Sequence, residues 1–473
     1  MAGTFIAGEK KVRPGAYFNI QKKSEAASDV MEGVTIVIFK ADFGPLNTVV
    51  ELSAEDGYEG TFGTGMTTDA IKEAIAGGAK TIIACRVGSG GTKGTVVLKD
   101  TNDEDVLTIT ARYSGDKEFF VTVRNKLTNS SFKECIFYAG TTELEKITFE
   151  AGNGEAGALA NALASSKNFD AELAAEKEDA DLSTVLQCAF NKGTNPQTTV
   201  EDYSNAFTTV EPYEANTICV DTENIEVHIL LQSFLNRIFD AGSLMQAVIA
   251  ESHTVDLEIR KEHAEAFNDE KMNYILNAHI RKQDRNKIQS EEIDGYQTAA
   301  RIAGMIGAAK SNSSLTHTVI TGYTEILENL SNTEIASAEK RGCIVLSYNK
   351  AKQVWIDNAI NTLVIPADNQ DDGWKKIRRV KTRFELIRRI NNLTDELAGK
   401  VENDTNGKAT VISQIQVVGD AMKEEGKLVS CVVTESNTDI TDVDSAWFDI
   451  DIIDKDSMEH IYLTFLFQFS TSA

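Results

Sequence analysis

Histidines and cysteines are the residues of this sequence best suited to metal binding or nucleophilic catalysis. The six histidines are dispersed, without an HExxH motif or a close ligand pair. The six cysteines form no CxxC pair, which is typical of free, buried thiols in a reducing compartment. No GxSxG nucleophile elbow occurs, although members of a catalytic triad need not be neighbours in sequence. The motifs therefore predict no catalytic residue, metal ligand or cofactor.

A glycine-rich loop at residues 88–94, GSGGTKG, follows a predicted strand and contains a lysine, as phosphate-binding loops do. The residue order does not fit, because Thr92 precedes Lys93 and Gly94 follows it. A phosphate site would also need a helix N-terminus after the loop, whereas short alternating strands follow. We interpret this loop as a hinge between domains.

A basic segment at residues 374–390, WKKIRRVKTRFELIRRI, carries eight basic residues and one acidic residue between Lys375 and Arg389. At helical spacing, one apolar stripe runs along it, formed by Ile377, Val380, Phe384 and Ile387. The segment is either a solvated or internally paired helix face, or a docking face for an acidic surface. For docking we nominate six residues: Lys375, Arg378, Arg379, Lys381, Arg388 and Arg389.

The two chain ends have the pattern of exposed strands. Residues 461–469, IYLTFLFQF, are uncharged, and their odd positions are apolar, including Ile461, Leu463, Phe465 and Phe467. Such a strand aggregates if its edge stays open, so it pairs within its own domain or adds to a neighbouring copy. Residues 1–22 form a polar arm with one extended stretch that holds Tyr17, Phe18 and Ile20. Head-to-tail exchange of both ends that does not close would generate a helix of subunits.

The chain length of 473 residues predicts several domains, and the hydrophobic fraction of 42% indicates a folded protein. Its net charge of −25 argues against a nucleic-acid or anionic-membrane binder, and makes copies repel one another at long range. No signal peptide or membrane-spanning stretch is found, so we expect synthesis in the cytosol without membrane insertion.

The elements expected between the ends fall into four groups. An α/β unit has strands at 34–39 and 81–87 around a helix at 69–75. Four short strands, at 95–98, 106–110, 119–123 and 135–138, predict a β-sandwich. Strands at 217–220, 246–250 and 342–347, with helices near 224–240 and 297–310, predict a mostly parallel sheet covered on both faces. The last group has the basic helix and a strand hairpin that pairs 411–418 with 428–434.

Five short motifs, in order, resemble the tail sheath proteins of contractile phages and phage-derived bacteriocins. The most specific is YQTAARIAGMIG at 296–307, with SSLT at 313–316. The others are RPGAY at 13–17, FGPLN at 43–47, LTITARYSG at 107–115 with FVTV at 120–123, and GW at 373–374 with Arg378, Arg379 and a terminal EHIYLT at 459–464.

The resemblance implies an α/β and β multidomain fold with terminal strand arms. The expected parts are an N-terminal strand arm (1–22), an N-terminal α/β unit (23–92), an inserted β-sandwich (93–180), a subtilisin-like α/β domain (181–355), an α+β C-terminal domain facing the tube (356–458) and a C-terminal strand arm (459–473). The term subtilisin-like concerns the fold alone, because no protease triad is recognisable.

The resemblance also implies a structural, non-enzymatic function. Subunits would polymerise as stacked hexameric rings around an inner tail tube protein, contact baseplate and tail terminator proteins, and contract to drive the tube through a target cell envelope. Assembly would take place in the bacterial host cytoplasm, before release in a virion tail or bacteriocin. The alternatives are a soluble hydrolase with a subtilisin-like domain and an assembly protein that does not contract.

Overall fold

The computed structural model describes residues 3–4, 17–18, 31–152, 154–283, 290–368, 370–436 and 444–467. The chain divides into two units, Met1–Val30 and Met31–Ala473. In the first unit, β1 (Gly3–Thr4) pairs in parallel with β2 (Tyr17–Phe18). The predicted arm strand is thus present at Tyr17 and Phe18, whereas Ile20 lies outside the described residues.

The centre of the second unit is a seven-stranded sheet of order β19-β15-β14-β13-β3-β5-β4. All its neighbouring strands pair in parallel except the antiparallel β4 and β5. Its strands are β3 (Val34–Phe39), β4 (Val49–Ser53), β5 (Thr81–Arg86), β13 (Thr217–Val220), β14 (Gln246–Ala250), β15 (Met272–Ile275) and β19 (Cys343–Ile344). Every strand of this sheet except β4 is buried on both faces, as parallel sheets require, and β3 and β13 are rich in β-branched residues. Strands from the segments 34–86 and 217–344 therefore share one sheet.

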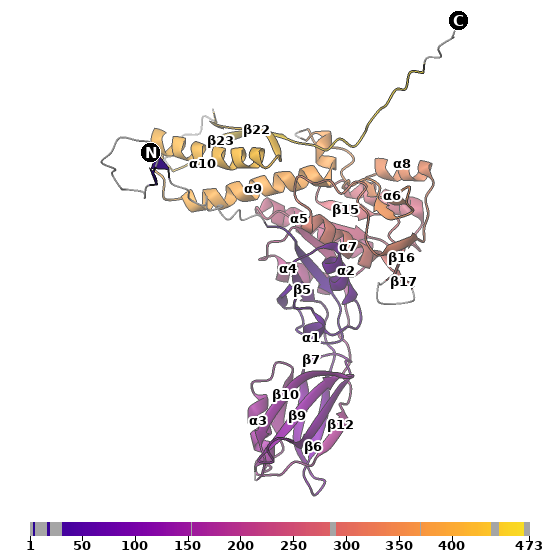
Figure 1. The fold of residues 1–473 in the computed structure, drawn as a ribbon, viewed down its shortest axis with the longest axis vertical. Helices are drawn as coiled ribbons and strands as arrows, with labels where there is room; N and C mark the ends of the chain where they lie inside the picture. The colour runs from indigo at the N-terminus through magenta and orange to yellow at the C-terminus, as the bar shows by residue number, and fades with distance from the viewer. Residues whose placement is uncertain are drawn as a thin grey trace. The chain divides into compact units, whose positions relative to one another are not determined.

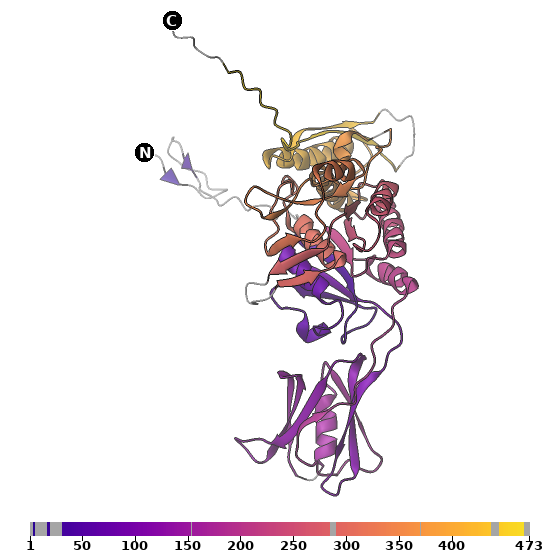
Figure 2. The ribbon, with the colours of Figure 1, turned by 90° about the vertical axis from the view of Figure 1, so that its right-hand side faces the viewer.

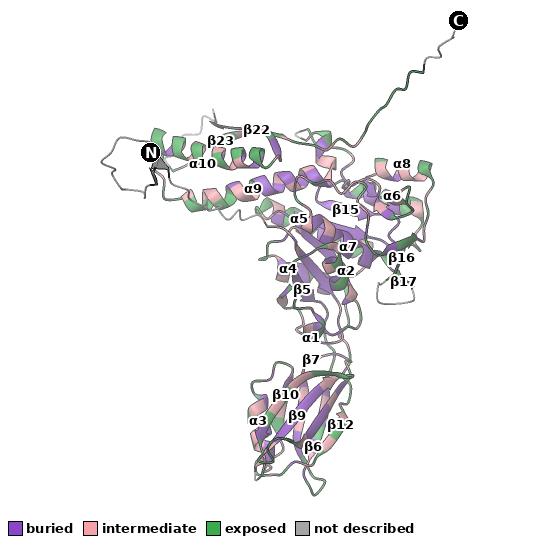
Figure 3. Cartoon of the chain, in the orientation of Figure 1, coloured by how far each residue is buried: buried purple, intermediate pink, exposed green. Residues whose placement is uncertain are grey.

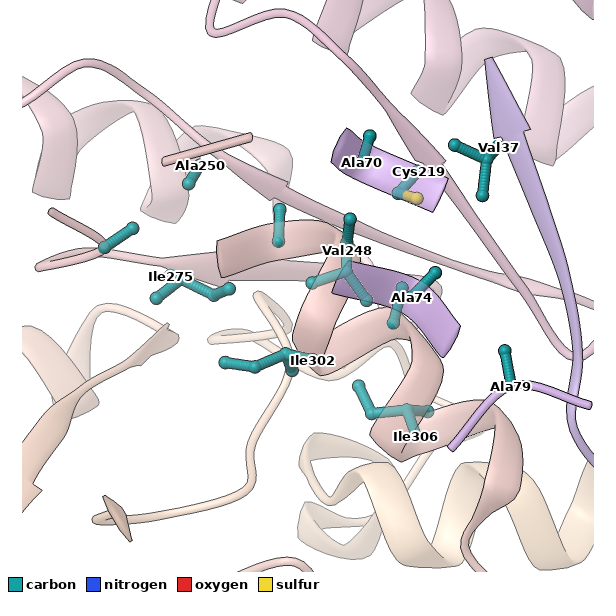
Figure 4. Packing of buried hydrophobic residues seen from close by; sticks show 14 of the residues in the cluster. Val37, Ala70, Ala74, Ala79, Cys219, Val248, Ala250, Ile275, Ile302 and Ile306 are labelled. Atoms are coloured by element: carbon teal, nitrogen blue, oxygen red, sulfur yellow. The ribbon is translucent and has the colours of Figure 1, made fainter. Parts of the chain in front are cut away.

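Helices cover both faces of this sheet (Figure 1). On one face lie α2 (Asp69–Gly77) and α7 (Gly295–Ala308), whose apolar residues share one core with the sheet (Figure 4). The other face carries α4 (Val200–Val210), α5 (Ile225–Asp240), α6 (Leu257–Phe267) and α8 (Asn332–Lys340). A short α1 (Glu59–Phe62) precedes α2.

The motif at 296–307 lies on α7, and its small residues let α7 approach α2 closely. A Cβ added at Gly304 would lie 2.1 Å from the Ala74 carbonyl oxygen, so no larger residue fits. Beside this crossing, Glu73 binds Arg301 through Nε at 2.8 Å and Lys282 at 2.5 Å. All three side chains are buried, and Lys282 belongs to a small sheet of β16 (Ile280–Gln283), β17 (Ser290–Ile293) and β18 (Tyr323–Ile326).

Between β5 and α4 the chain forms two further sheets, of order β10-β9-β8-β12 and β11-β7-β6. Their elements are β6 (Lys93–Lys99), β7 (Asp105–Ser114), β8 (Phe119–Asn125), β9 (Phe132–Ala139), β10 (Thr142–Glu150), α3 (Glu155–Leu163), β11 (Phe169–Leu173) and β12 (Val185–Ala189). The two sheets and α3 enclose one apolar core, rich in phenylalanine. The four short strands expected here are confirmed, and three further strands complete the sheets.

The glycine-rich loop lies where the chain leaves β5 for the β6–β12 sheets. It pairs with the returning chain through bridges between Ser89 and Gln197 and between Thr92 and Thr194. Arg86, 1% exposed, lies at the same junction and donates to the carbonyl oxygens of Ala41, Gly44 and Ser114.

The last part of the chain begins with β20 (Leu346–Tyr348), β21 (Val354–Ile356) and the turn η1 (Asp372–Lys375). It continues with α9 (Ile377–Leu397), α10 (Thr405–Glu424), β22 (Leu428–Glu435) and β23 (Phe448–Asp454). The hairpin predicted from 411–418 and 428–434 is wrong, because 411–418 lies within α10 and the partner of β22 is β23.

Candidate assembly surfaces

The C-terminal part of the chain packs two helices against a single two-stranded sheet. Residues of α9, α10 and β22 share a small core that includes Leu386, Ile415, Met422 and Val433. The helix α10 lies very close to β22, since a Cβ on Gly419 would lie 2.4 Å from the Cys431 sulfur. A sheet of two strands is narrower than two helices, so part of the apolar surface of α9 is left beside β23.

The basic side chains at the start of α9 are paired within the chain. Asp454, at the end of β23, accepts from Arg379 Nε at 2.8 Å and from its Nη2 at 2.5 Å. Arg383 lies 3.3 Å from the same carboxylate, and Asp371 contacts both guanidinium groups. The hydrogen bond to Asp454 raises the pKa of Arg379 above its usual value, although burial opposes this shift.

The remaining basic side chains of α9 also have partners within the chain. Arg389 binds Glu425 at 2.8 Å and also contacts Glu385, while Arg388 donates to the Leu244 carbonyl at 2.6 Å. The ammonium group of Lys381 contacts two carbonyl oxygens at the end of α7, and its burial lowers its pKa to about 7.

These contacts show that the nominated basic side chains have partners within the chain. Of the six nominated residues, Arg378, Arg379, Arg388 and Arg389 are 15% exposed or less, and Lys381 is held against α7. Lys375, at 34%, is more exposed and pairs with Asp372. The structure matches the other interpretation, in which the basic residues pair internally with acids. Docking on a tube is not tested by these contacts and stays a prediction.

An open groove of about 670 Å³ lies between α9 and β23. Its apolar lining is Trp374, Leu386, Ile387, Ile450, Ile452 and Ile453, and its charged lining is Asp371, Arg379, Arg383 and Asp454. Ile387, Ile452 and Ile453 are 36%, 40% and 58% exposed. Arg383 stacks on Trp374 with 4.1 Å between the guanidinium carbon and the ring centroid. The apolar lining of the groove is therefore only partly covered by other side chains.

The strand β23 borders this groove and pairs with β22 on one side. Within the described residues no strand pairs with its other edge. A free edge presents unpaired N–H and C=O groups that can bind a further strand. The sequence analysis missed β23, although the alternation FDIDIID at 448–454 is the signal for it.

The part of the predicted terminal strand that the structure describes, residues 461–467, does not pair with another strand of the chain. Residues 461–467 have no secondary structure, and Ile461, Leu463, Phe465 and Phe467 are 67%, 71%, 71% and 83% exposed. Figures 1 and 2 show this segment running away from the elements that precede it, and Figure 3 shows it as exposed. Phe469 lies outside the described residues.

The segment between β23 and this terminal arm is fastened to α9 and its start. Lys376 binds Asp456 at 2.8 Å and Glu459 at 2.9 Å, and Arg378 donates to Ser457 at 2.8 Å. Glu459 also accepts from Ser314, whose motif was part of the resemblance, at 3.1 Å. The hydrogen bond from Lys376 lowers the pKa of Asp456, against the effect of its burial.

The described residues contain little that resembles a catalytic or metal site. No group of three or more potential ligands lies together in this part of the chain, and none of its helices has the length and apolar character to cross a membrane. Buried Glu251 accepts from Tyr274 at 2.9 Å and contacts His263 Nδ1 at 2.9 Å. No serine or cysteine is hydrogen-bonded to a histidine among the described residues, and all six cysteines are free.

Comparison with known proteins agrees with this architecture. Residues 197–362, which include most of the large sheet and α7, match the family model of the phage tail sheath protein central domain. The chain carries a tail sheath domain. The resemblance to contractile tail sheath proteins found from the sequence motifs is thereby confirmed.

Similarity extends over nearly the whole chain. YqbK of Bacillus subtilis (strain 168) is 20% identical over 459 residues, covering 94% of this chain and 91% of YqbK. The sheath tail protein from Desulfitobacterium hafniense superimposes with a TM-score of 0.69 at 17% identity, covering 93% of this chain and all of that one. The helical sheath protein of the anti-feeding prophage in its contracted state has a TM-score of 0.53 at 9% identity, over 97% of this chain and 99% of its own. The chain thus shares the mixed α/β, multi-sheet fold of sheath proteins.

Proposed function

We propose that this chain is the structural subunit of a contractile tail sheath, and that its copies are joined by strand exchange. The proposal is supported by two features of the same chain, each of which leaves a surface uncovered. One is the uncovered apolar arm at 461–467, and the other is the free edge of β23 above a half-covered apolar groove. The arm has apolar side chains without a cover, and β23 has an unpaired edge beside an apolar groove that the arm could cover.

The arm and the edge fit one another in length and chemistry. The described arm has seven residues, as has β23. Side chains alternate across a strand, so Ile461, Leu463, Phe465 and Phe467 would all face the groove when the backbone pairs with β23. Burying each such side chain contributes about 1.5–3 kcal/mol, while ordering each backbone residue costs about 1–2 kcal/mol. Pairing is therefore favourable only when apolar burial and backbone hydrogen bonds are both made.

The contacts at the base of the arm favour donation to another copy. To pair with its own β23, the chain would have to reverse direction directly after Asp454. Asp456, Ser457 and Glu459 are instead held by Lys376, Arg378 and Ser314. These contacts fix the chain beside the start of α9, from where the arm continues outward (Figure 2).

The larger assembly is proposed from the likeness to sheath proteins. Stacked hexameric rings would surround an inner tail tube and contact baseplate and tail terminator proteins. Contraction would be a change from one packing of the same domains to another, and it would drive the tube through a target cell envelope. The particle, a virion tail or a bacteriocin, would be assembled in the host cytoplasm. The domain boundaries and subtilisin-like central domain expected from the sequence belong to this proposal, with the α/β unit at 23–92 and the segment 181–355 contributing strands to one sheet. A structural role without catalysis belongs to it as well.

Complementation between two defective variants tests strand exchange. A copy without residues 459–473 keeps the β23 edge and lacks the arm, whereas an Ile452→Asp copy keeps the arm and has a charged groove. We expect neither variant to polymerise alone, and their mixture to give one-to-one complexes, measured by light scattering. A Thr464→Asp copy is the matched control and should polymerise alone, because Thr464 would lie on the face of the arm that does not meet the groove.

Electron microscopy of the intact chain tests the sheath assignment. Hollow striated tubes support it, whereas discrete particles favour an assembly protein that does not contract. Polymers formed by the truncated copy would contradict strand exchange. For tube docking, Lys375→Glu is the cleanest change, because Lys375 is the more exposed of the nominated residues and its pairing partner Asp372 is 88% exposed. Undiminished binding of this variant to the tube would contradict a role for Lys375.

A further inference from the structure

The two outer edges of the β22–β23 sheet differ in what is hydrogen-bonded to them. On the β22 side, the side-chain Nε2 of Gln416, from α10, donates to the Cys431 carbonyl oxygen at 2.9 Å. The Oε1 of the same amide accepts from the Val433 N–H at 3.3 Å. Among the described residues, no side chain is hydrogen-bonded to the backbone of β23, and only the side chain of Asp454 is engaged there.

The two bonds from Gln416 occupy the place of a neighbouring strand. Along a strand, the N–H and C=O groups of successive residues point alternately to the two sides of the ladder. Cys431 and Val433 are two residues apart, so the groups bonded to Gln416 share one side, while Val432 between them lies opposite Asp451 of β23. A strand added to β22 would need the same oxygen and the same N–H. The amide must therefore leave before a strand can pair there.

The packing of α10 holds Gln416 within reach of this edge. Gly419, three residues onward, lets the helix approach β22, since a Cβ there would lie 2.4 Å from the Cys431 sulfur. Asp420, one turn onward, accepts from the Gln416 Nε2 at 3.2 Å. The amide is thus fastened on both sides, by its own helix and by the strand.

The composition of β22 makes an uncovered edge prone to unwanted pairing. Residues 428–434, LVSCVVT, contain no charge, glycine or proline, which is the composition of segments that pair indiscriminately. Val429 and Val432 are 51% and 50% exposed, so apolar surface lies beside the edge. The sequence of β23, FDIDIID, has three aspartates instead. Without a cover, β22 would be the better template for an uncharged strand such as the arm.

We propose that Gln416 closes the edge of β22 in the free subunit, so that the arm of another copy is added to β23. This inference rests on the proposed strand exchange and names the residue that selects the acceptor edge. One side-chain amide supplies both the donor and the acceptor that the exposed backbone groups require. Gln416 is a positioning residue, because it directs the arm without touching the groove beside β23.

Hydrogen exchange in the full-length Ile452→Asp copy, whose arm is intact and whose groove is charged, tests the closure of the edge. Adding Gln416→Ala should speed exchange of the Val433 amide about fivefold to tenfold, as expected for the loss of one hydrogen bond. The matched control is Gln414→Ala, the same change at an exposed position of α10, which should leave this rate unchanged.

Sedimentation velocity of the same copies tests the choice of edge. Under the proposed strand exchange, Ile452→Asp alone stays a single subunit. With Gln416→Ala added, the arm should gain access to β22, and complexes should form. With Gln414→Ala added instead, the copies should remain single. Gln416→Met, which keeps the length of the side chain without its donor and acceptor, serves if the alanine variant does not fold.

The outcomes separate this inference from the proposed function. Polymers of Ile452→Asp alone would contradict acceptance of the arm beside β23, and the inference with it. If that copy stays single and the further change at Gln416 still yields no complexes, the inference is overturned while strand exchange stands. Unchanged exchange of the Val433 amide would overturn it equally.

Discussion

Replacing Asp454 by alanine should release the β22–β23 hairpin from α9. Asp454 is 7% exposed in its side chain and bridges Arg379 and Arg383, which are 15% and 14% exposed. Removing one partner of a buried ion pair costs about 3–5 kcal/mol, because the other charge is left without compensation. Asp371 contacts both arginines and remains in the variant, and it is 61% exposed, so we lower the expected cost to about 2 kcal/mol.

Hydrogen exchange measures this cost locally, which is necessary because a chain of several domains does not unfold in one step. A loss of about 2 kcal/mol corresponds to about 30-fold lower protection in β22, β23 and the first turns of α9. Protection in the seven-stranded sheet should not change. Since the same hairpin provides the proposed acceptor edge, polymer formation should weaken together with its protection.

Asp451→Ala is the control, because Asp451 lies on the same strand, is exposed, and makes no ion pair with another described residue. Its protection factors should stay within threefold of wild type. Equal effects of the two substitutions would refute the reasoning, since they would show that a negative charge on β23, and not its pairing with α9, stabilises the hairpin.

Two further predictions concern the rest of the second unit. Arg86→Met should lower the free energy of local opening at β5 by about 3 kcal/mol, measured by hydrogen exchange, because the carbonyl oxygens of Ala41, Gly44 and Ser114 lose their donors. Unchanged protection in β5 would contradict this account. Although burial acts in the opposite direction, the hydrogen bond from Lys133 at 2.5 Å lowers the pKa of Glu155 below its ordinary value of 4.5. Folding stability from this pair is therefore present above pH 4.5 and is lost as the pH falls through the lowered pKa of Glu155. Protection against hydrogen exchange in the β6–β12 sheets should fall more steeply below pH 4.5 in wild type than in Glu155→Gln.

The strands of the large sheet could be predicted from the sequence because their residues carry the signal locally. Runs such as VTIVIF in β3 and TIIACR in β5 are β-branched, apolar and bounded by glycine, and both became buried strands. What local pattern does not contain is the order of the strands. The joining of β3 to β13, far apart in sequence, follows from chain topology and was not predicted.

The helix α10 was mistaken for a strand for an identifiable reason. Its residues 411–418, VISQIQVV, are rich in β-branched side chains, which favour strands. Asp404 nevertheless caps the helix by accepting from the Gly407 N–H at 2.7 Å, and buried Ile415, Gly419 and Met422 recur at helical spacing. Packing of this face against β22 overrides the intrinsic preference of the residues.

The basic segment of α9 shows what a charge pattern in one segment cannot reveal. Its basic residues resemble a docking face as long as the acids that pair with them are not placed beside them. Asp454, for example, lies 75 residues after its partner Arg379. Once these charges are paired internally, the chain still carries its net charge of −25, so copies repel one another at distances beyond the screening length of about 10 Å at 0.1 M salt. Attraction between copies must then come from short-range contacts that add no charge. The arm residues 461–467 are uncharged, and the apolar lining of the groove beside β23 consists of isoleucines with Trp374 and Leu386. The charged lining residues of this groove are already paired with one another. The two surfaces proposed to join the subunits are therefore of the kind that a strongly acidic polymer requires.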